Sequence, residues 1–258
     1  MQHPPTGQFT DGIVRCVVSD PDRGNSLSIA ALERAAELLE SGASGTKGVR
    51  AVLLTGSESA FCNGGDVTAF ASAPDPSAYI GDLATRFHQF IRVVTSTPIP
   101  VVAAVRGWAA GAGMSIACAA DVIVGGPSTA FLPAYPGIGL SPDGGMTWTL
   151  PRVVGFARAR DMLLTNQPIR GQAAYDHGLL TRFVDDDQVL STAESIACGL
   201  ASGPGSAHAA IKRLLWQAQR AELSPHLDAE AESIAHLAGS AEGREGVAAF
   251  VERRRPKF

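Results

Sequence analysis

The 258-residue sequence lacks several features that would have fixed its class at once. Its formal net charge is only −4, so it has no basic excess of the kind that binds nucleic acid. No apolar run reaches the roughly 20 residues that cross a bilayer, and the longest, Ile99 to Val105, is strand-sized. The polar segment from Met1 to Thr10 does not have the layout of a secretion signal. We therefore expect a cytoplasmic protein without nucleic-acid or membrane partners.

Cysteine is also scarce. Four cysteines occur without CxxC spacing, each among apolar or small residues: Cys16, Cys62, Cys118 and Cys198. We expect four unpaired, buried thiols in a reducing compartment. The chain is nevertheless 45% hydrophobic, and its length supports one large domain, or one domain with a small appendage.

Alternating patterns over the first 140 residues predict an α/β fold. Runs rich in β-branched residues predict strands at Ile13 to Val18, Val49 to Thr55, Pro100 to Val105 and Val122 to Val124. Apolar residues at helical spacing predict helices at Ser28 to Glu40 and at Ala78 to Thr95. Strands separated by helices imply crossover connections, and so a mostly parallel sheet.

After about residue 156 the strand signals nearly vanish. Helices are predicted at Arg158 to Leu164, Gln172 to His177, Asp187 to Ala201, Ser206 to Ala221, Leu227 to Leu237 and Gly243 to Arg253. The Gly203-Pro204-Gly205 break marks a candidate boundary. We therefore expect a core over residues 1–200 and a helical region over residues 201–258.

Two glycine-rich corners follow two of the predicted strands. The first runs from Ala60 to Val67 and contains Gly64-Gly65-Asp66, where Asp66 could equally be a simple helix N-cap. The second runs from Val105 to Ser115, ahead of a helix expected at Ser115 to Ala120. Small residues let a backbone expose its N–H groups to a ligand, although they also allow ordinary tight packing. Neither corner matches a dinucleotide fingerprint. Together they suggest two N–H donors that converge on one ligand oxygen.

With these motifs the sequence resembles the crotonase (enoyl-CoA hydratase/isomerase) superfamily from about residue 12 to Phe258. Both corners look like the two oxyanion corners of that family. The stretch from Phe131 to Val154, with Ser141-Pro142-Asp143-Gly144-Gly145, resembles its catalytic loop, and Glu245 to Arg254 resembles its C-terminal signature. The resemblance implies a β-β-α spiral core with a C-terminal helical oligomerisation region, assembled as a homotrimer or a dimer of trimers. It also implies a CoA-thioester substrate, with no metal and no cofactor.

The resemblance also implies roles for individual residues. The backbone N–H groups of Gly65 and Ala112 would form the oxyanion hole. The substrate-binding residues implied in the same way are Arg23, Ser26, Asn63, Gly64, Asp66, Val67, Trp108, Tyr135 and His88. Lys257 is a candidate phosphate contact.

The departures from the family pattern bear on the reaction. Hydratases of this family use two Glu residues, and Ser115 and Tyr135 occupy those positions here. A hydroxyl and a phenol do not supply the chemistry of paired carboxylates, so we expect hydration to be disfavoured. Asp143 stands where several enoyl-CoA isomerases of the family carry their single base, although an N-cap would also explain it.

The sequence therefore favours an isomerase that moves a double bond in an acyl-CoA, with Asp143 as the base. Phenylacetyl-CoA isomerases carry Asp in the same context, so aryl substrates stay open. Dehalogenases of the superfamily match His88 and Asp143 but have Trp at the position of Tyr135. Dehalogenation or hydrolysis with Asp143 as nucleophile, hydratase-like chemistry and non-catalytic acyl-CoA binding remain alternatives.

Overall fold

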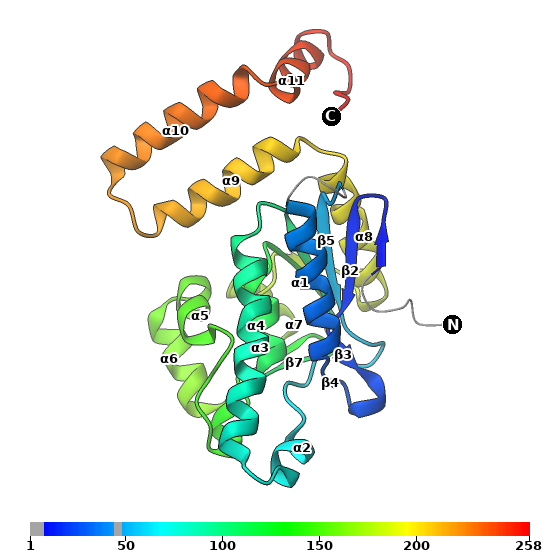
Figure 1. Cartoon of the computed structure of the whole chain (residues 1–258), viewed down its shortest axis with the longest axis vertical. Coiled ribbons are helices and arrows are strands. Elements are labelled where there is room, and N and C mark those ends of the chain that lie inside the picture. Colours follow the sequence, from blue (N-terminus) through cyan, green and yellow to red (C-terminus); the bar gives the residue numbers. More distant parts are fainter. Residues whose placement is uncertain (1–7, 44–47) are drawn as a thin grey trace.

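A six-stranded sheet forms the centre of the protein (Figure 1). The structure is a computed structural model, and it describes residues 8–43 and 48–258, so most of the polar N-terminal segment lies outside the described residues. The strands lie in the order β1 (Gln8–Thr10), β2 (Ile13–Val17), β5 (Ala51–Thr55), β6 (Val101–Val105), β8 (Val122–Gly125) and β11 (Arg182–Phe183). β1 pairs antiparallel with β2, and every other neighbouring pair is parallel. The predicted α/β fold with a mostly parallel sheet is confirmed.

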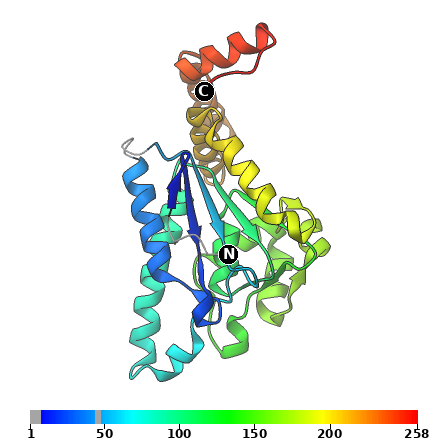
Figure 2. The ribbon, with the colours of Figure 1, turned by 90° about the vertical axis from the view of Figure 1, so that its right-hand side faces the viewer.

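The central strands are buried on both faces because helices cover each side (Figure 2). One face of β5, with Val52 and Leu54, belongs to the same apolar core as α1 (Ile29–Ala43) and α3 (Pro76–Ser96). The other face, with Ala51 and Leu53, packs on α8 (Val189–Ala201). The two cores follow from the strand period of two, which sends successive side chains to opposite faces.

Short strands complete the β-structure. A three-stranded sheet has the order β10 (Ile169–Arg170), β9 (Ala130–Leu132) and β7 (Trp108–Ala110), and the hairpin of β3 (Ser19–Asp20) and β4 (Ser26–Leu27) stands apart. These strands have two or three residues each, too few for the sequence to show a period of two. These strands were therefore not predicted from the sequence.

Further helices complete the core. They are α2 (Val67–Ser72), α4 (Ala112–Ala119), α5 (Met146–Val154), α6 (Phe156–Thr165) and α7 (Gly171–Asp176). Short 3₁₀ turns lie at Pro21–Arg23, Tyr135–Ile138 and Asp186–Gln188. The prediction that the helix after the second corner starts at Ser115 is wrong: α4 begins at Ala112, directly after Gly111.

The last three helices extend from the core as an arm at the end of the molecule opposite α2 (Figures 1 and 2). They are α9 (Gly205–Ala218), α10 (Leu223–Ala238) and α11 (Ala241–Val251). The Lys212 ammonium anchors α9, because it donates to Asp121 Oδ2 at 2.7 Å and to the Ile99 carbonyl at 2.9 Å. Apolar side chains on the arm stay exposed, among them Ile234 at 71% and Phe250 at 86%. The division into residues 1–200 and 201–258 stays a prediction.

Three of the four cysteines are buried as expected, and burial raises the pKa of Cys16, Cys62 and Cys118 to about 12. The prediction for Cys198 is wrong, because this thiol is exposed. α8 buries residues four apart, including Ala193 and Ala197, and Cys198 lies just off that stripe. Within the described residues, none of the helices combines the length and apolar character that crossing a bilayer requires.

Candidate active site

The two glycine-rich corners lie against each other. Cys62 forms a parallel bridge with Ala109. The Cys62 N–H donates to the Trp108 carbonyl at 3.0 Å, and the Ala110 N–H donates to the Cys62 carbonyl at 2.8 Å. The corners approach so closely that a Cβ on Gly64 would lie 3.0 Å from the Ala110 oxygen and 3.6 Å from the Ala112 nitrogen. Glycine at this position, with φ +92°, therefore permits both the turn and the contact.

Two of the backbone N–H groups at these corners, those of Gly65 and Ala112, have no acceptor among the described residues. Ala112 is the first residue of α4, so its N–H has no partner within the helix and lies at the positive end of the helix dipole. Gly65 directly precedes Asp66, the N-cap of α2. Both residues line the same cavity. Two free donors facing one cavity can stabilise a negative charge that develops on a ligand oxygen.

This cavity has a volume of about 320 Å³ and a mostly apolar lining. The apolar side chains come from β4, α2, α3 and the loop after β9, and include Leu27, Phe70, Leu83, Phe87, Ile138 and Leu140. None of these six residues was predicted from the sequence to line the site. Those of α3 lie on a helical apolar stripe that reads as ordinary core. A pocket of this kind, with few polar groups, suits an apolar ligand held by one polar end.

Asp143 contributes a carboxylate to the same cavity, from the loop that precedes α5. It is half-buried, and no other Asp or Glu among the described residues lines this cavity. Its Oδ1 accepts a hydrogen bond of 2.6 Å from the Tyr135 hydroxyl. It is not the N-cap of α5, since Gly145 precedes that helix. The N-cap explanation for this residue is therefore wrong.

Two hydroxyl side chains surround Asp143. Ser115, fully buried in α4, donates to the Asp143 carbonyl at 3.0 Å, and its Oγ lies 3.4 Å from the Tyr135 hydroxyl. Burial, and then the charge of Asp143, raises the pKa of the Tyr135 phenol far above its ordinary value. Tyr135 therefore stays protonated and acts as a hydrogen-bond donor.

His88 lies in α3 beside this loop, but it does not line the cavity. Its Nε2 accepts the Gly144 N–H at 3.0 Å. An imidazole nitrogen that accepts a hydrogen bond carries no proton, so this contact uses the neutral ring. His88 therefore holds the backbone of Gly144, the residue that follows Asp143.

A second cavity of about 280 Å³ adjoins the first and shares Leu27, Gly65 and Leu83 with it. Arg23 and Asp66 line it and form an ion pair of 2.6 Å. The Ala69 N–H and then Arg23 lower the pKa of Asp66, whose carboxylate also caps α2. The N-cap role considered for Asp66 is therefore present together with the ion pair.

The other predicted substrate-binding residues fall into two groups. Gly64, Asn63 and Val67 line the first cavity, and the Asn63 amide also donates to the Gly24 carbonyl at 2.9 Å. Ser26 and Trp108 line neither cavity. Ser26 is buried in the β3–β4 hairpin, and the Trp108 ring lies under the Arg170 guanidinium at 4.3 Å.

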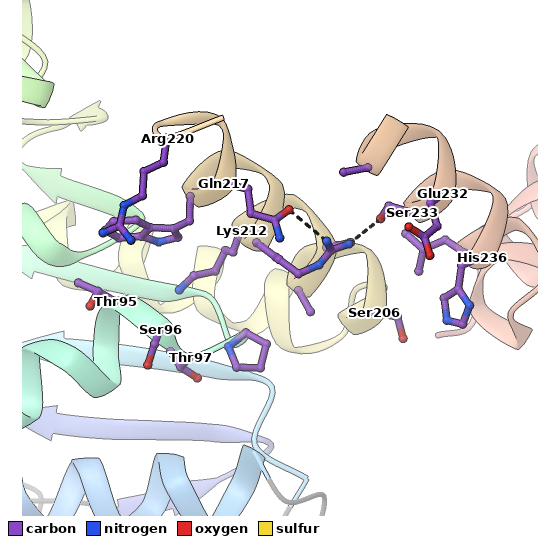
Figure 3. Close-up of a pocket in the computed structure, with 17 residues that line it drawn as sticks. Thr95, Ser96, Thr97, Ser206, Lys212, Gln217, Arg220, Glu232, Ser233 and His236 are labelled. Carbon is purple, nitrogen blue, oxygen red and sulfur yellow. Dashed lines mark hydrogen bonds between the residues drawn. The ribbon is translucent and has the colours of Figure 1, made fainter. Parts of the chain in front are cut away.

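A cavity of about 980 Å³, larger than these two, lies elsewhere, between α9, α10 and the end of α3 (Figure 3). Its polar groups bind one another: Arg213 donates to Gln217 at 3.2 Å and to Ser233 at 3.1 Å. Neither oxyanion corner nor Asp143 reaches it.

Comparison with known proteins gives the family. The family model for enoyl-CoA hydratase/isomerase matches residues 8–258. A probable enoyl-CoA hydratase of Rhodobacter capsulatus is 41% identical, with 81% of this chain and 80% of that protein covered. The 1,2-epoxyphenylacetyl-CoA isomerase of Escherichia coli is 35% identical, with 96% and 95% covered. An enoyl-CoA hydratase structure from Polaromonas sp. JS666 superposes with a TM-score of 0.89 at 30% identity, with 98% of each chain covered. The chain therefore belongs to the enoyl-CoA hydratase/isomerase family and is a crotonase-superfamily enzyme of CoA thioesters.

Proposed function

We propose that this enzyme is an enoyl-CoA isomerase that uses Asp143 as its base. Asp143 would take a proton from C2 of a 3-enoyl thioester and return it at C4, so that the double bond moves into conjugation. The negative charge passes to the thioester oxygen, where the Gly65 and Ala112 N–H groups would hold it. One carboxylate both removes and returns the proton, so the reaction needs no activated water and no cofactor beyond the CoA of the substrate.

One observation carries the proposal: a single carboxylate and two free backbone donors line the same apolar cavity. The donors stabilise charge that exists only once C2 has lost its proton, which is how such groups accelerate a reaction. An apolar lining also strengthens these interactions, because it excludes water from the charge.

The same observation favours isomerisation over hydration, although several relatives are named hydratases. Activation of a water calls for a base and an acid at opposite ends of the double bond. Ser115 is instead committed to the Asp143 carbonyl, and Tyr135 is a phenol that burial keeps protonated. Neither group supplies a second carboxylate.

The adjoining cavity offers a place for the polar part of the thioester. Arg23 and Arg86 line it, and Gly65 lines both cavities, so a ligand could run from the arginines to the oxyanion donors. The exposed apolar side chains of the arm fit assembly through α10 and α11, as a trimer or a dimer of trimers.

A ring-bearing acyl group is the second candidate substrate. Phe70, Phe87 and Tyr135 line the cavity, and aromatic side chains pack well on an aryl group. The Escherichia coli relative is named for a phenylacetyl-CoA derivative. Comparison of kcat/KM for aliphatic and for aryl 3-enoyl thioesters would rank the two substrate classes.

Asp143→Asn tests the proposal. The amide keeps an oxygen that can accept from Tyr135, and the backbone bond from Ser115 does not involve the side chain. We expect the isomerisation rate to fall by about 10²–10⁴-fold, the usual contribution of a positioned acid–base group. Asp187→Asn, at an exposed residue outside the cavity, is the matched control.

The rival chemistry makes Asp143 a nucleophile toward the substrate. A single turnover in oxygen-18 water would then place label in the Asp143 carboxyl, whereas proton transfer leaves it unlabelled. Near-native turnover of Asp143→Asn on every enoyl-CoA that the wild type accepts would rule out both roles. Binding of acyl-CoA with neither isomerisation of any 3-enoyl-CoA nor exchange of solvent deuterium at C2 would identify a non-catalytic acyl-CoA binder.

A further inference from the structure

The backbone just before Tyr135 adopts an unusual conformation. Ala134 has φ +68° and ψ −32°, a region that residues with a side chain rarely occupy. The side chain of Asn166, which ends α6, supports it, because its Oδ1 accepts the Ala134 N–H at 2.8 Å. Strain of this kind persists only where the surrounding structure enforces it, and it gathers at functional sites.

The strained residue directs Tyr135 into the site. Tyr135 starts a 3₁₀ turn, lines the cavity, and donates at 2.6 Å to Asp143 Oδ1, eight residues along the chain. Ser115 contacts both members of the pair, with its Oγ 3.4 Å from the phenol and 3.0 Å from the Asp143 carbonyl. The carboxylate is therefore fixed at one of its two oxygens.

We propose that Tyr135 is a positioning residue that selects the oxygen of Asp143 that moves the proton. With Oδ1 held by the phenol, Oδ2 is the oxygen left to take the C2 proton. The phenol keeps its own proton throughout, so no charge or atom is transferred to it. This inference rests on the proposed function, and it adds that the hydrogen bond from Tyr135 sets the orientation of the Asp143 carboxylate.

The arrangement has a consequence for the fate of the proton. After transfer, the O–H bond lies on Oδ2, and the Tyr135 bond prevents the carboxylic acid from turning. The proton is then returned at C4 before it meets water. Without the phenol, the acid group can rotate and exchange its proton with solvent.

The test compares Tyr135→Phe with wild type on a 3-enoyl-CoA in D₂O. We expect kcat to fall at least about tenfold, because loss of a hydrogen bond to a charged group has an effect of about that size. We expect KM to stay nearly unchanged. We also expect more solvent deuterium at C4 of the product. Tyr175→Phe is the matched control, since Tyr175 is exposed in α7 and packs on Phe183.

Ala134→Gly is the second variant. It keeps the phenol but allows the backbone to relax, because glycine occupies positive φ without strain. We expect a smaller fall in kcat and a smaller rise in solvent deuterium at C4 than in Tyr135→Phe. This variant also serves if Tyr135→Phe fails to fold.

Crystal structures of the two variants decide the geometry independently of turnover. The inference predicts a turned or doubly oriented Asp143 carboxylate in Tyr135→Phe. A carboxylate that keeps its wild-type orientation overturns the inference, whatever the substrate. Unchanged kcat and deuterium content in Tyr135→Phe, with Asp143→Asn inactive, overturns it while leaving the proposed function intact. Active Asp143→Asn overturns the proposed function instead.

Discussion

Ala112→Pro should remove one proposed oxyanion donor and leave the fold in place. Proline is tolerated at the first position of a helix, where the N–H has no intrahelical acceptor. Ala112 holds that position in α4, and no described residue accepts its N–H. The preceding Gly111, with φ 53° and ψ −123°, lies outside the helical region that a following proline disfavours. The substitution therefore deletes a donor without deleting a hydrogen bond of the fold.

The expected loss of kcat in Ala112→Pro follows from the catalytic groups that the variant keeps. Gly65 still offers its N–H and Asp143 still offers its carboxylate, so the variant keeps part of the site. Loss of one oxyanion donor costs about 10²–10³-fold in kcat, or about 3–4 kcal/mol in the barrier. A compatible proline changes the free energy of unfolding by no more than about 1 kcal/mol. We therefore expect a large loss of kcat in a protein of nearly unchanged stability.

The assay is steady-state isomerisation of a 3-enoyl-CoA, accompanied by circular dichroism and urea unfolding. Ala241→Pro is the matched control, because Ala241 is the exposed first residue of α11, in the arm. A folded Ala112→Pro variant with wild-type kcat would show that the Ala112 N–H is not an oxyanion donor. Gly65 is a poorer target for the same test, because a Cβ there would lie 2.3 Å from the Phe70 ring.

Two further predictions concern the scaffold. Gly113→Ala should lower the free energy of unfolding by about 1–3 kcal/mol, since its Cβ would lie 2.3 Å from the Cys62 carbonyl oxygen, a backbone atom that cannot move aside; urea unfolding at wild-type stability would contradict this. Phe250→Asp should lower the mass of the proposed oligomer in light scattering, because Phe250 is 86% exposed on the arm; a wild-type mass would show that Phe250 is not part of a subunit contact.

The strands and helices of the core could be predicted wherever their apolar period was long enough. α3 and β6 were predicted to within a few residues, because each carries a regular run of buried side chains. The start of α4 was missed because Gly111-Ala112-Gly113 shows no period at all. β7 and β9 were missed because three residues are too few to show one.

The candidate site shows a similar division. The glycine corners could be located from their residue types and spacing, whereas Asp143 was singled out by the resemblance to the family. The bond between Tyr135 and Asp143 could not, because it depends on the positive φ of Ala134, a residue with no preference for that conformation. The contact of His88 with Gly144 depends in turn on how α3 packs beside the loop, which only the tertiary structure shows.

The structure of the wild-type enzyme with a 3-enoyl-CoA analogue bound would test the central proposal most directly. We predict the thioester oxygen about 2.7–3.1 Å from the Gly65 and Ala112 nitrogens. We also predict Asp143 Oδ2 about 3–3.5 Å from both C2 and C4, the distance at which proton transfer can begin. A thioester oxygen bound away from these two nitrogens, or an Asp143 carboxylate out of reach of C2, would contradict the account.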